Sequence, residues 1–268
     1  MKFLKISVIL LFAIALTTLG IDASDTLSGS GNTLLAQLVS LKEKSLCPVG
    51  MVHVPSALTF TCADIYEASA NPDCPHENPE NEFESKTNVE QDTCTAISRE
   101  NNVPWRFITR EQASLACVRA GKRLPKSSEW YMLSVGTREG VDVCNIETAG
   151  HTKNGEKKLC VSATGVHDAI GNVWEWTSDD VIDGMYEGRK LPVDGYVAQV
   201  DAGGMATQVS DKTSDLFYSD YFWSTAEGSF GILRGGFFGS RSDAGVYAAH
   251  ARTVPTSFGT AIGFRCIL

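Results

Sequence analysis

The sequence lacks the short patterns by which many enzymes and metalloproteins are recognised. None of its eight cysteines stands in a Cys-x-x-Cys pair, which argues against a structural zinc site. Its five histidines include no His-x-x-His or His-Glu-x-x-His arrangement, so the zinc hydrolase pattern is absent. There is no Gly-x-Ser-x-Gly elbow and no phosphate-binding glycine loop, which argues against the common serine hydrolase and nucleotide-binding classes.

Positive charge is also scarce. The chain has 23 Lys and Arg residues against 32 Asp and Glu residues, and its formal net charge is -9. An acidic surface repels a phosphate backbone, so we expect no nucleic acid among the partners. The hydrophobic content of 43% is that of an ordinary globular protein, and one domain from 47 to 268 accounts for the chain after its N-terminal segment.

An apolar run stands at the start of the chain. Lys2 and Lys5 precede apolar residues from about Val8 to Leu16, and small residues follow up to Ala23. This pattern predicts a signal peptide at 1–23, followed by a linker or short helix at 24–46. The run is short for a membrane span, and an uncleaved N-terminal anchor is the alternative. We therefore expect a secreted or cell-surface protein, held at a membrane only if this segment is retained, whose cysteines form disulfides.

Two helices are predicted, both before residue 137. The first begins after Thr109, an N-cap with Gln112 three residues later, and ends at Gly121. The second extends from 127 or 128 to 136. From there on Gly, Asp and Ser are as dense as in loops that connect short strands. Helices early and irregular β structure late predict an α+β domain.

Four motifs occur in order along the chain: GKRLPKSSEW at 121–130, GVHDAIGNVWEWTSD at 165–179, LRGG at 233–236 and GFRC at 263–266. Together they resemble the formylglycine-generating enzyme domain, also called the sulfatase-modifying factor domain, over roughly residues 47–268. The resemblance implies an α+β, C-type-lectin-like formylglycine-generating-enzyme fold with little regular secondary structure. It does not by itself imply the enzyme's chemistry.

The oxidase reaction of that family depends on two cysteines shortly after Arg-Gly-Gly, which hold a copper ion. Thiolates are the ligands that monovalent copper prefers. The ungapped match places Ser240 and Gly245 at those positions, and no cysteine occurs from 161 to 265. We therefore expect no copper and no enzyme activity, and an active sulfatase-modifying oxidase is the alternative.

The resemblance also implies a disulfide between Cys117 and Cys266, which would join the first predicted helix to the C-terminus. Spacing along the chain suggests three further pairs: Cys144 with Cys160, Cys74 with Cys94, and Cys47 with Cys62.

The DAIGNVWE stretch is predicted to bind structural calcium. The family uses this loop for calcium, and hard cations prefer carboxylate and carbonyl oxygens on one tight loop. The matching ligands are the side chains of Asp168 and Glu175 and the carbonyls of Gly171 and Val173. In the alternative, Trp174 and Trp176 belong to the core and Glu175 lies in a buried hydrogen-bonded pair.

The segment from 237 to 262 contains no Trp, Gln, Met, Lys or Glu. These are the five residue types that cannot arise when the adenines of an Asn codon ending in cytosine are randomised. This bias and the flanking motifs resemble the variable proteins of diversity-generating retroelements, which diversify the last segment of this same domain. In the alternative, the segment drifted after its cysteines were lost.

The resemblance implies a noncatalytic binding protein whose segment 237–262 contacts a protein or glycan ligand. Rigid scaffolds that display Tyr, Phe, Ser, Arg and Gly bind in the manner of antibody loops. The predicted contacts are Ser240, Arg241, Asp243, Tyr247, His250, Arg252, Thr253, Phe258 and Thr260. Tyr218, Tyr221, Phe222 and Trp223 are expected either to line this surface or to pack beneath it. A calcium-stabilised structural domain of a larger surface complex is a further alternative.

Overall fold

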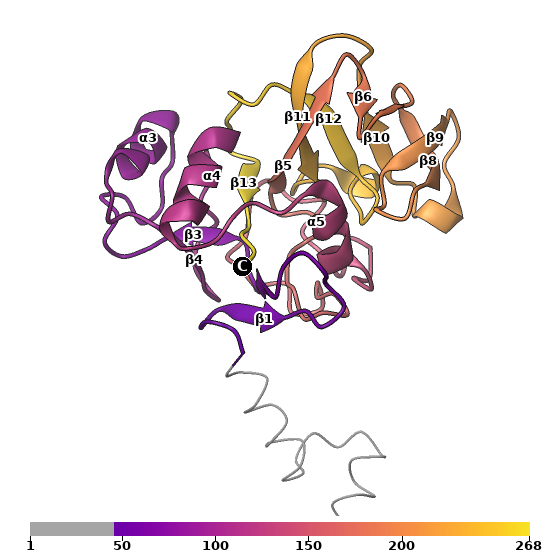
Figure 1. The fold of residues 1–268 in the computed structure, drawn as a ribbon. Helices are drawn as coiled ribbons and strands as arrows, with labels where there is room; N and C mark the ends of the chain where they lie inside the picture. Colours follow the sequence, from indigo (N-terminus) through magenta and orange to yellow (C-terminus); the bar gives the residue numbers. More distant parts are fainter. Residues whose placement is uncertain (1–45) are drawn as a thin grey trace, which may run out of the picture. The chain divides into compact units, whose positions relative to one another are not determined.

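The computed structural model describes residues 46–268. The predicted signal peptide at 1–23 and the predicted linker or short helix at 24–46 lie outside them, apart from Leu46. Within the described residues, no helix is both long enough and apolar enough to cross a membrane. Residues 49–268 form one compact unit, whose arrangement is drawn in Figure 1.

Three α-helices occur in the described chain: α3 (Glu82–Glu90), α4 (Arg110–Arg119) and α5 (Ser127–Ser134). Helix α4 begins where the capping pattern predicts. Thr109 Oγ1 accepts a hydrogen bond from Gln112 N at 3.3 Å, and Gln112 Oε1 accepts one from Thr109 N at 3.0 Å. The sequence pattern does not predict α3, because its buried residues are the polar Ser85 and Asn88 and no apolar stripe marks its inner face.

The main sheet of the described chain has nine strands in the order β7-β6-β5-β11-β12-β10-β8-β9, with β13 added in parallel beside β5. Its strands are β5 (Trp174–Ile182), β6 (Met185–Tyr186), β7 (Arg189–Lys190), β8 (Gly195–Val200), β9 (Ala206–Ser210), β10 (Tyr221–Trp223), β11 (Ser229–Arg234), β12 (Ala249–Thr253) and β13 (Ile262–Phe264). Two short antiparallel pairs lie apart from it: β1 (Met51–His53) with β2 (Cys62–Asp64), and β3 (Ala68–Ala70) with β4 (Ala96–Ser98). Figure 1 shows α3 and α4 on one side of β13 and the other strands of the main sheet on the other side.

The four sequence motifs meet at β5. This strand pairs with β11, which carries the Arg-Gly-Gly motif, and with β13, which carries the C-terminal motif. As a result Trp176 on β5 lies between Leu233 on one side and Phe264 on the other. Trp130 of α5, from the first motif, is fully buried and donates a hydrogen bond from Nε1 to Glu175 Oε2 at 2.7 Å. Motifs that are far apart along the chain therefore form one core.

Disulfides join the outer segments to this core. The bonded pairs are Cys117–Cys266, Cys74–Cys94 and Cys144–Cys160. The first is the pair that the family resemblance implies; it joins α4 to the C-terminus across a separation of 149 residues. The other two are the pairs that spacing suggests. Cys47 and Cys62 are also disulfide-bonded, and no cysteine is free among residues 46–268.

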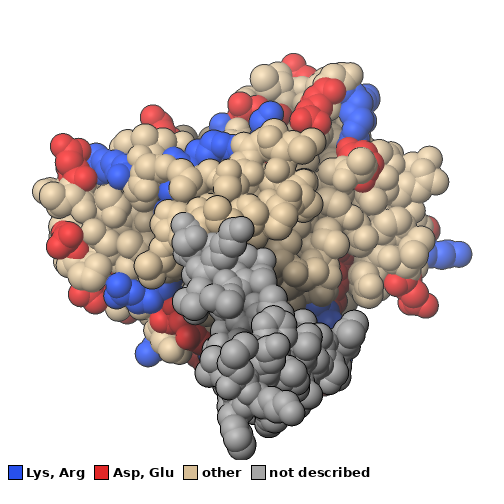
Figure 2. All heavy atoms as spheres, turned by 60° about the horizontal axis from the view of Figure 1, so that its bottom comes forward, with Lys and Arg blue, Asp and Glu red and all other residues tan. Residues whose placement is uncertain are grey.

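Charged side chains lie mostly toward the edges of the face drawn in Figure 2. Lys and Arg side chains stand there next to Asp and Glu side chains, and they form no continuous basic patch on this face of the described chain. Binding of nucleic acid requires a basic stripe or patch. That the partner is not a nucleic acid stays a prediction from the acidic composition.

Candidate binding site

Segment 237–262 is anchored at its beginning by Arg234, Gly235 and Gly236. Gly235 and Gly236 have φ angles of 89° and 91°, and a Cβ on Gly236 would lie 2.4 Å from another side-chain atom. These conditions favour glycine alone. Arg234 is fully buried, lies over the ring of Trp130 at 5.1 Å and donates from Nη2 to the carbonyl of Val246 at 2.9 Å. The segment therefore leaves the sheet in one fixed direction, and its first turn is tied back to the framework.

The other end of the segment is anchored by Arg265. Its guanidinium forms a bidentate pair with Glu175, from Nε to Oε2 at 2.6 Å and from Nη2 to Oε1 at 2.5 Å. The two side chains are 0% and 1% exposed. The guanidinium also donates to the carbonyls of Asp64 and His167. Glu175 thus lies in a buried hydrogen-bonded pair, which is the arrangement we considered as the alternative to a calcium ligand.

Between these anchors the segment lines a cavity of about 340 Å³, named here the first cavity. Six of its eight lining residues belong to the segment, and they are His250, Thr253, Gly259, Thr260, Ala261 and Ile262. The framework contributes Trp174 and Leu233. His250 and Thr253 lie on β12, whereas the other four lie on the loop into β13 and at its first residue. Two stretches of the segment therefore meet at one site.

Aromatic rings continue from this cavity across the sheet. Trp223 on β10 lies 5.7 Å from Trp174 and 5.5 Å from His250 between ring centroids. Tyr221 lies 4.7 Å from Trp223 and 5.1 Å from Tyr196 on β8. The parallel pairing of β10 with β12 sets Trp223 beside His250. Trp223 is only partly buried, so it packs against the core and also presents part of its ring at the surface.

His250 is uncharged at neutral pH. Burial, and then the positive charge of Arg252, lower the pKa of His250 to about 4. Its Nδ1 lies 2.6 Å from Thr253 Oγ1. Arg252 is exposed and pairs with Asp194. The first cavity therefore has a neutral and largely apolar lining that includes the rings of Trp174 and His250, which suits an apolar or aromatic group of a ligand.

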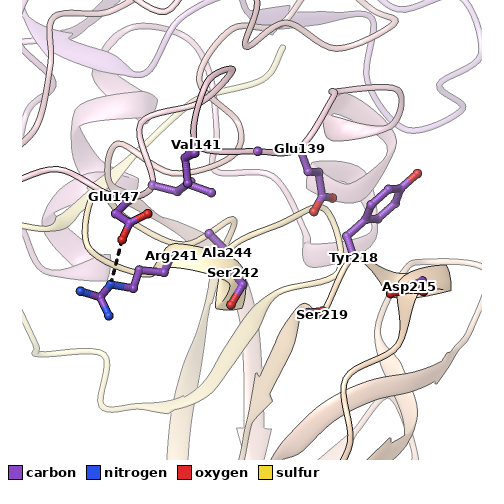
Figure 3. A pocket seen from close by; sticks show the side chains of 11 residues that line it. Glu139, Val141, Glu147, Asp215, Tyr218, Ser219, Arg241, Ser242 and Ala244 are labelled. Atoms are coloured by element: carbon purple, nitrogen blue, oxygen red, sulfur yellow. Dashed lines mark ion pairs between the residues drawn. The ribbon is translucent and has the colours of Figure 1, made fainter.

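The second cavity, of about 530 Å³, lies beside the first turn of the segment (Figure 3). Arg241, Ser242 and Ala244 of the segment line it together with framework residues that include Glu139 and Tyr218. No motif in the sequence marks the framework wall of this cavity.

The other predicted contacts on the loops of the segment differ in exposure. Ser240 precedes the 3-10 turn η2 (Arg241–Asp243), and its Oγ accepts a backbone hydrogen bond from residue 237 at 3.0 Å. Asp243 is half-buried, and burial raises its pKa. Phe258 is 40% exposed, and Thr260 is exposed at the edge of the first cavity. The structure brings His250, Thr253 and Thr260 together at the first cavity and places Arg241 at the second.

Tyr247 and the aromatic residues at 218–223 divide between core and surface. The ring of Tyr247 lies 5.8 Å from that of Tyr131 and 5.2 Å from that of Phe217, so it is half-buried. Phe222 is fully buried, whereas Tyr218 is 58% exposed and lines the second cavity. Both roles considered for these aromatic residues therefore occur.

Tyr196, Asp194 and Glu139 are not among the predicted contacts. Tyr196 extends the row of aromatic rings, Asp194 pairs with Arg252, and Glu139 lines the second cavity. A signal exists for Tyr196, because buried Val197 alternates with partly exposed neighbours along β8 and places Tyr196 on the other face. Its pairing with Tyr221 depends on strand order. Glu139 lies in a loop, where no periodic pattern indicates which way a side chain points.

The positions of the copper ligands in catalytic family members are filled differently here. A Cβ added at Gly245 would lie 2.0 Å from Asp220 Oδ1. Tyr247 N donates to Asp220 Oδ2 at 2.7 Å, which holds this carboxylate in place. A cysteine at 245 would require the loop to shift, and Ser240 offers a hydroxyl rather than the thiolate that monovalent copper prefers. The residues present do not fit a copper ion.

The two predicted calcium ligands with carboxylate side chains, Asp168 and Glu175, are buried together with Glu67. Glu67, Asp168 and Glu175 are 0%, 2% and 1% exposed. Burial, and then the charge of Asp168, raise the pKa of Glu67, and burial raises the pKa of Asp168 to about 6. Arg265 pairs with Glu175, and Arg106 is a second buried cation that interacts with Glu67, so three buried carboxyl groups face two buried cations.

The donor atoms fit calcium in their chemistry, because all of them are oxygens. Asp168 Oδ2 accepts a hydrogen bond from Gly155 N at 2.6 Å. Within residues 46–268 no three acidic, His or Cys side chains converge closely enough to hold one metal ion. Calcium at this loop would therefore depend on the carbonyls of Gly171 and Val173 as well as on side chains.

These observations first define a class: an α+β, C-type-lectin-like scaffold that ends in a surface segment held at both ends. Residues 73–268 match the family model described as "Sulfatase-modifying factor enzyme 1-like domain", and the chain belongs to this family. The family and the fold that the four motifs predict are confirmed.

Solved structures with a similar fold include the "Major Tropism Determinant P3c Variant", with 20% identity, coverage of 83% of this chain and 53% of that chain, and a TM-score of 0.48. The chain thus spans about half the length of that protein. Others are "Treponema denticola variable protein 1" (14% identity, 82% and 99% coverage, TM-score 0.43) and PvdO from Pseudomonas aeruginosa (13%, 77% and 80%, 0.37). No curated protein sequence matches the chain.

Proposed function

We propose that the chain is an exported, noncatalytic binding protein that presents segment 237–262 as a diversified surface for a protein or glycan ligand. The observation that carries the proposal is the first cavity, because six of its eight lining residues come from this segment. Arg234 and Arg265, both fully buried, hold the two ends of the segment. A fixed frame around an exposed and chemically varied segment is the arrangement of a binding scaffold.

The composition of the segment supports diversification. It lacks the five residue types that adenine-directed changes of an Asn codon cannot produce. Of the residues that are present, His250 lines the first cavity. Arg252 is exposed on the same strand, and Phe258 is exposed on the loop that leads to β13.

The absence of catalysis is supported by the residues at the former copper positions. Ser240 and Gly245 supply no thiolate, and the cysteines of the described chain are all in disulfides. An oxidase of this family requires thiolate ligands for its copper. No observation on this chain favours the oxidase over a binding role.

Calcium is part of the proposal as a structural ion. Asp168, with the carbonyls of Gly171 and Val173, would hold it at the loop before β5. Glu175, the other predicted ligand, has both carboxylate oxygens paired with Arg265 and would supply only its negative charge nearby. The excess negative charge of the buried carboxylates supports a cation there. The ion would supply positive charge to the framework and take no part in contact with the ligand.

The proposal is tested by sequencing the 3′ end of the gene in a population of the source organism, together with its flanking DNA. We expect variation to be confined to codons between Gly236 and Gly263, at positions where a nearby template copy has adenine. Uniform codons in this segment, with no template, would refute diversification and leave an inherited ligand as the object of the search.

A second test asks whether the framework tolerates diversity at these positions. The first library randomises four codons of the segment, those of His250, Arg252, Phe258 and Thr260. The matched library randomises four codons of the residues that flank the segment, called the frame: Arg234, Gly235, Gly263 and Arg265. We expect most members of the first library to be secreted and folded, and few of the second, because the frame residues are buried or require positive φ. Equal losses in both libraries would contradict a binding segment built to vary.

A further inference from the structure

We infer that the second cavity binds a cationic organic group, namely the guanidinium or ammonium of a basic side chain on the ligand. The inference rests on the proposed binding function, and it names the chemistry that this part of the surface recognises. The second cavity is separate from the first cavity at His250, and different residues line the two.

Three separate stretches of chain build the walls. They are the loop at 139–147, the turn at 215–219 and the first turn of the segment at 241–244. The cavity of about 530 Å³ is large enough to admit a long side chain. It is open to solvent, and its lining residues Tyr218 and Arg241 are exposed. A side chain on a partner can therefore enter without a change in the fold.

The lining is acidic. Glu139, Glu147 and Asp215 line the cavity against a single base, Arg241. Arg241 Nε lies 3.4 Å from Glu147 Oε1, so the one base is already paired. Among the lining residues, Glu139 and Asp215 have no cationic partner. The chain as a whole is acidic, which adds a long-range attraction for cations.

A buried carboxylate lies behind this wall. Asp220 follows Ser219, which lines the cavity, and Asp220 is fully buried. Its Oδ2 accepts from Tyr247 N at 2.7 Å, and Glu139 Oε1 accepts from Val246 N at 3.0 Å. Burial raises the pKa of Glu139 to about 7. A side-chain hydrogen bond joins Glu139 and Asp220, so the two carboxyl groups share a proton, and a cation bound beside Glu139 would favour its release.

The position of Tyr218 completes the site. In Figure 3 the ring of Tyr218 and the carboxylate of Glu139 lie on the same side of the cavity, and the Arg241–Glu147 pair lies on the other side. The face of an aromatic ring attracts cations. A cation between Glu139, Tyr218 and Asp215 is therefore held by two carboxylates and a ring, away from the guanidinium of Arg241.

The geometry favours an organic cation over a metal ion. In the described part of the chain no three acidic, His or Cys side chains converge closely enough to ligate one ion. A guanidinium or ammonium group spreads its hydrogen bonds over a wider space, so separated carboxylates can hold it.

The test uses the full-length ¹⁵N-labelled protein and two probes of the same shape, N-acetyl-arginine amide and its neutral isostere N-acetyl-citrulline amide. NMR titration reads the backbone signals. We expect the arginine probe to shift signals at 139–147, 215–219 and 241–247, and to bind about tenfold more tightly than the citrulline probe. Raising the salt concentration should weaken the binding of the arginine probe but not of the citrulline probe, because the attraction of the arginine probe is electrostatic.

Variants locate the binding. Asp215→Asn should weaken the binding of the arginine probe about threefold to fivefold. The control Asp211→Asn changes an exposed acid of the same loop outside the cavity and should leave the affinity unchanged. Glu139→Gln keeps an acceptor for Val246 N and should weaken the binding of the arginine probe more than Asp215→Asn does. Equal binding of the two probes, shifts confined to other residues, or equal effects of the two Asp variants would overturn the inference.

The result separates this inference from the proposed function. If the arginine probe fails while codons of the segment vary in the population, the binding function stands and the ligand class is wrong. If the probe binds at this cavity while the codons are uniform, the cation site stands without diversification.

Discussion

Arg265 and Glu175 form a bidentate ion pair in which neither side chain reaches solvent, although the two residues are 90 positions apart in the sequence. Glu175 lies on β5 and Arg265 directly follows β13, so the pair ties the end of the segment to the centre of the main sheet. A buried ion pair offsets its desolvation cost only when further hydrogen bonds satisfy both groups. Here Trp130 donates to Glu175, and two carbonyls accept from Arg265.

The first prediction is that Arg265→Gln destabilises the fold by about 3–5 kcal/mol, because it leaves Glu175 buried without its counter-charge. Urea unfolding followed by tryptophan fluorescence measures the loss. Lys158→Gln is the control: Lys158 pairs with Glu100, but both side chains are largely exposed, so its removal should leave the unfolding midpoint nearly unchanged. If both variants unfold at the same urea concentration, the buried pair is not what holds the segment.

The residues that frame segment 237–262 are predictable from sequence because they meet local constraints or stand in the four motifs that carry the family resemblance. Gly235 and Gly236 are needed at positive φ, and Thr109 with Gln112 forms a capping box that any reader of the sequence can find. Such features depend on few neighbours. The helices at 110–119 and 127–134 could be placed for this reason, whereas polar α3 could not.

The cavities are much less predictable, because strand order creates them. Trp223 meets His250 only because β10 pairs with β12, and Tyr221 meets Tyr196 only because β10 also pairs with β8. Residue spacing does not determine these pairings. The segment that carries the site was identifiable from its composition, but the framework side of each cavity, including Glu139, was not.

The second prediction concerns pH. Burial raises the pKa of Glu139 to about 7, and burial, followed by the charge of Glu139, raises the pKa of Asp220. The folded protein therefore keeps these protons to a higher pH than the unfolded chain, where the pKa of a Glu is about 4.5. The stability from Glu139 is complete below about pH 4.5 and is lost as the pH rises through about 7.

Urea unfolding at pH 5 and at pH 8 measures this effect. We expect the wild-type protein to be less stable at pH 8, and Glu139→Gln to remove part of the difference, because the amide keeps the acceptor for Val246 N without titrating. Glu111→Gln changes an exposed acid on α4 and is the matched control. A pH dependence that is the same in all three proteins would show that the carboxyl pair does not titrate in this range.

The third prediction ranks two disulfides. Replacing Cys117 and Cys266 by Ser removes a cross-link across 149 residues, and replacing Cys74 and Cys94 removes one across 20. Restriction of the unfolded chain grows with loop length, so the losses should be about 5 and about 3 kcal/mol. Thermal unfolding of the two double variants compares them. A larger loss for the shorter loop would mean that native contacts, rather than the unfolded chain, determine the cost.

The fourth prediction concerns the proposed calcium ion. Adding calcium to chelator-treated protein should raise the melting temperature by several degrees, because an ion that binds only the folded state stabilises it. Asp168→Asn should abolish the rise, whereas Asp211→Asn, an exposed acid elsewhere, should not. A melting temperature that does not respond to calcium or chelator would remove the ion and leave Arg265 and Arg106 as the counter-charges of the buried acids.

The fifth prediction tests the lining of the first cavity through His250. Burial and the charge of Arg252 lower its pKa to about 4, so the imidazole should remain neutral from pH 8 to about pH 5 in an NMR titration. Arg252→Gln should raise the pKa, since one cause is removed and Asp194 remains nearby, but burial should still hold it below the usual 6.5. Arg119→Gln, far from the cavity on α4, should not change it. A wild-type midpoint near 6.5 would mean that water surrounds the ring, and the cavity would then offer no apolar lining for a ligand.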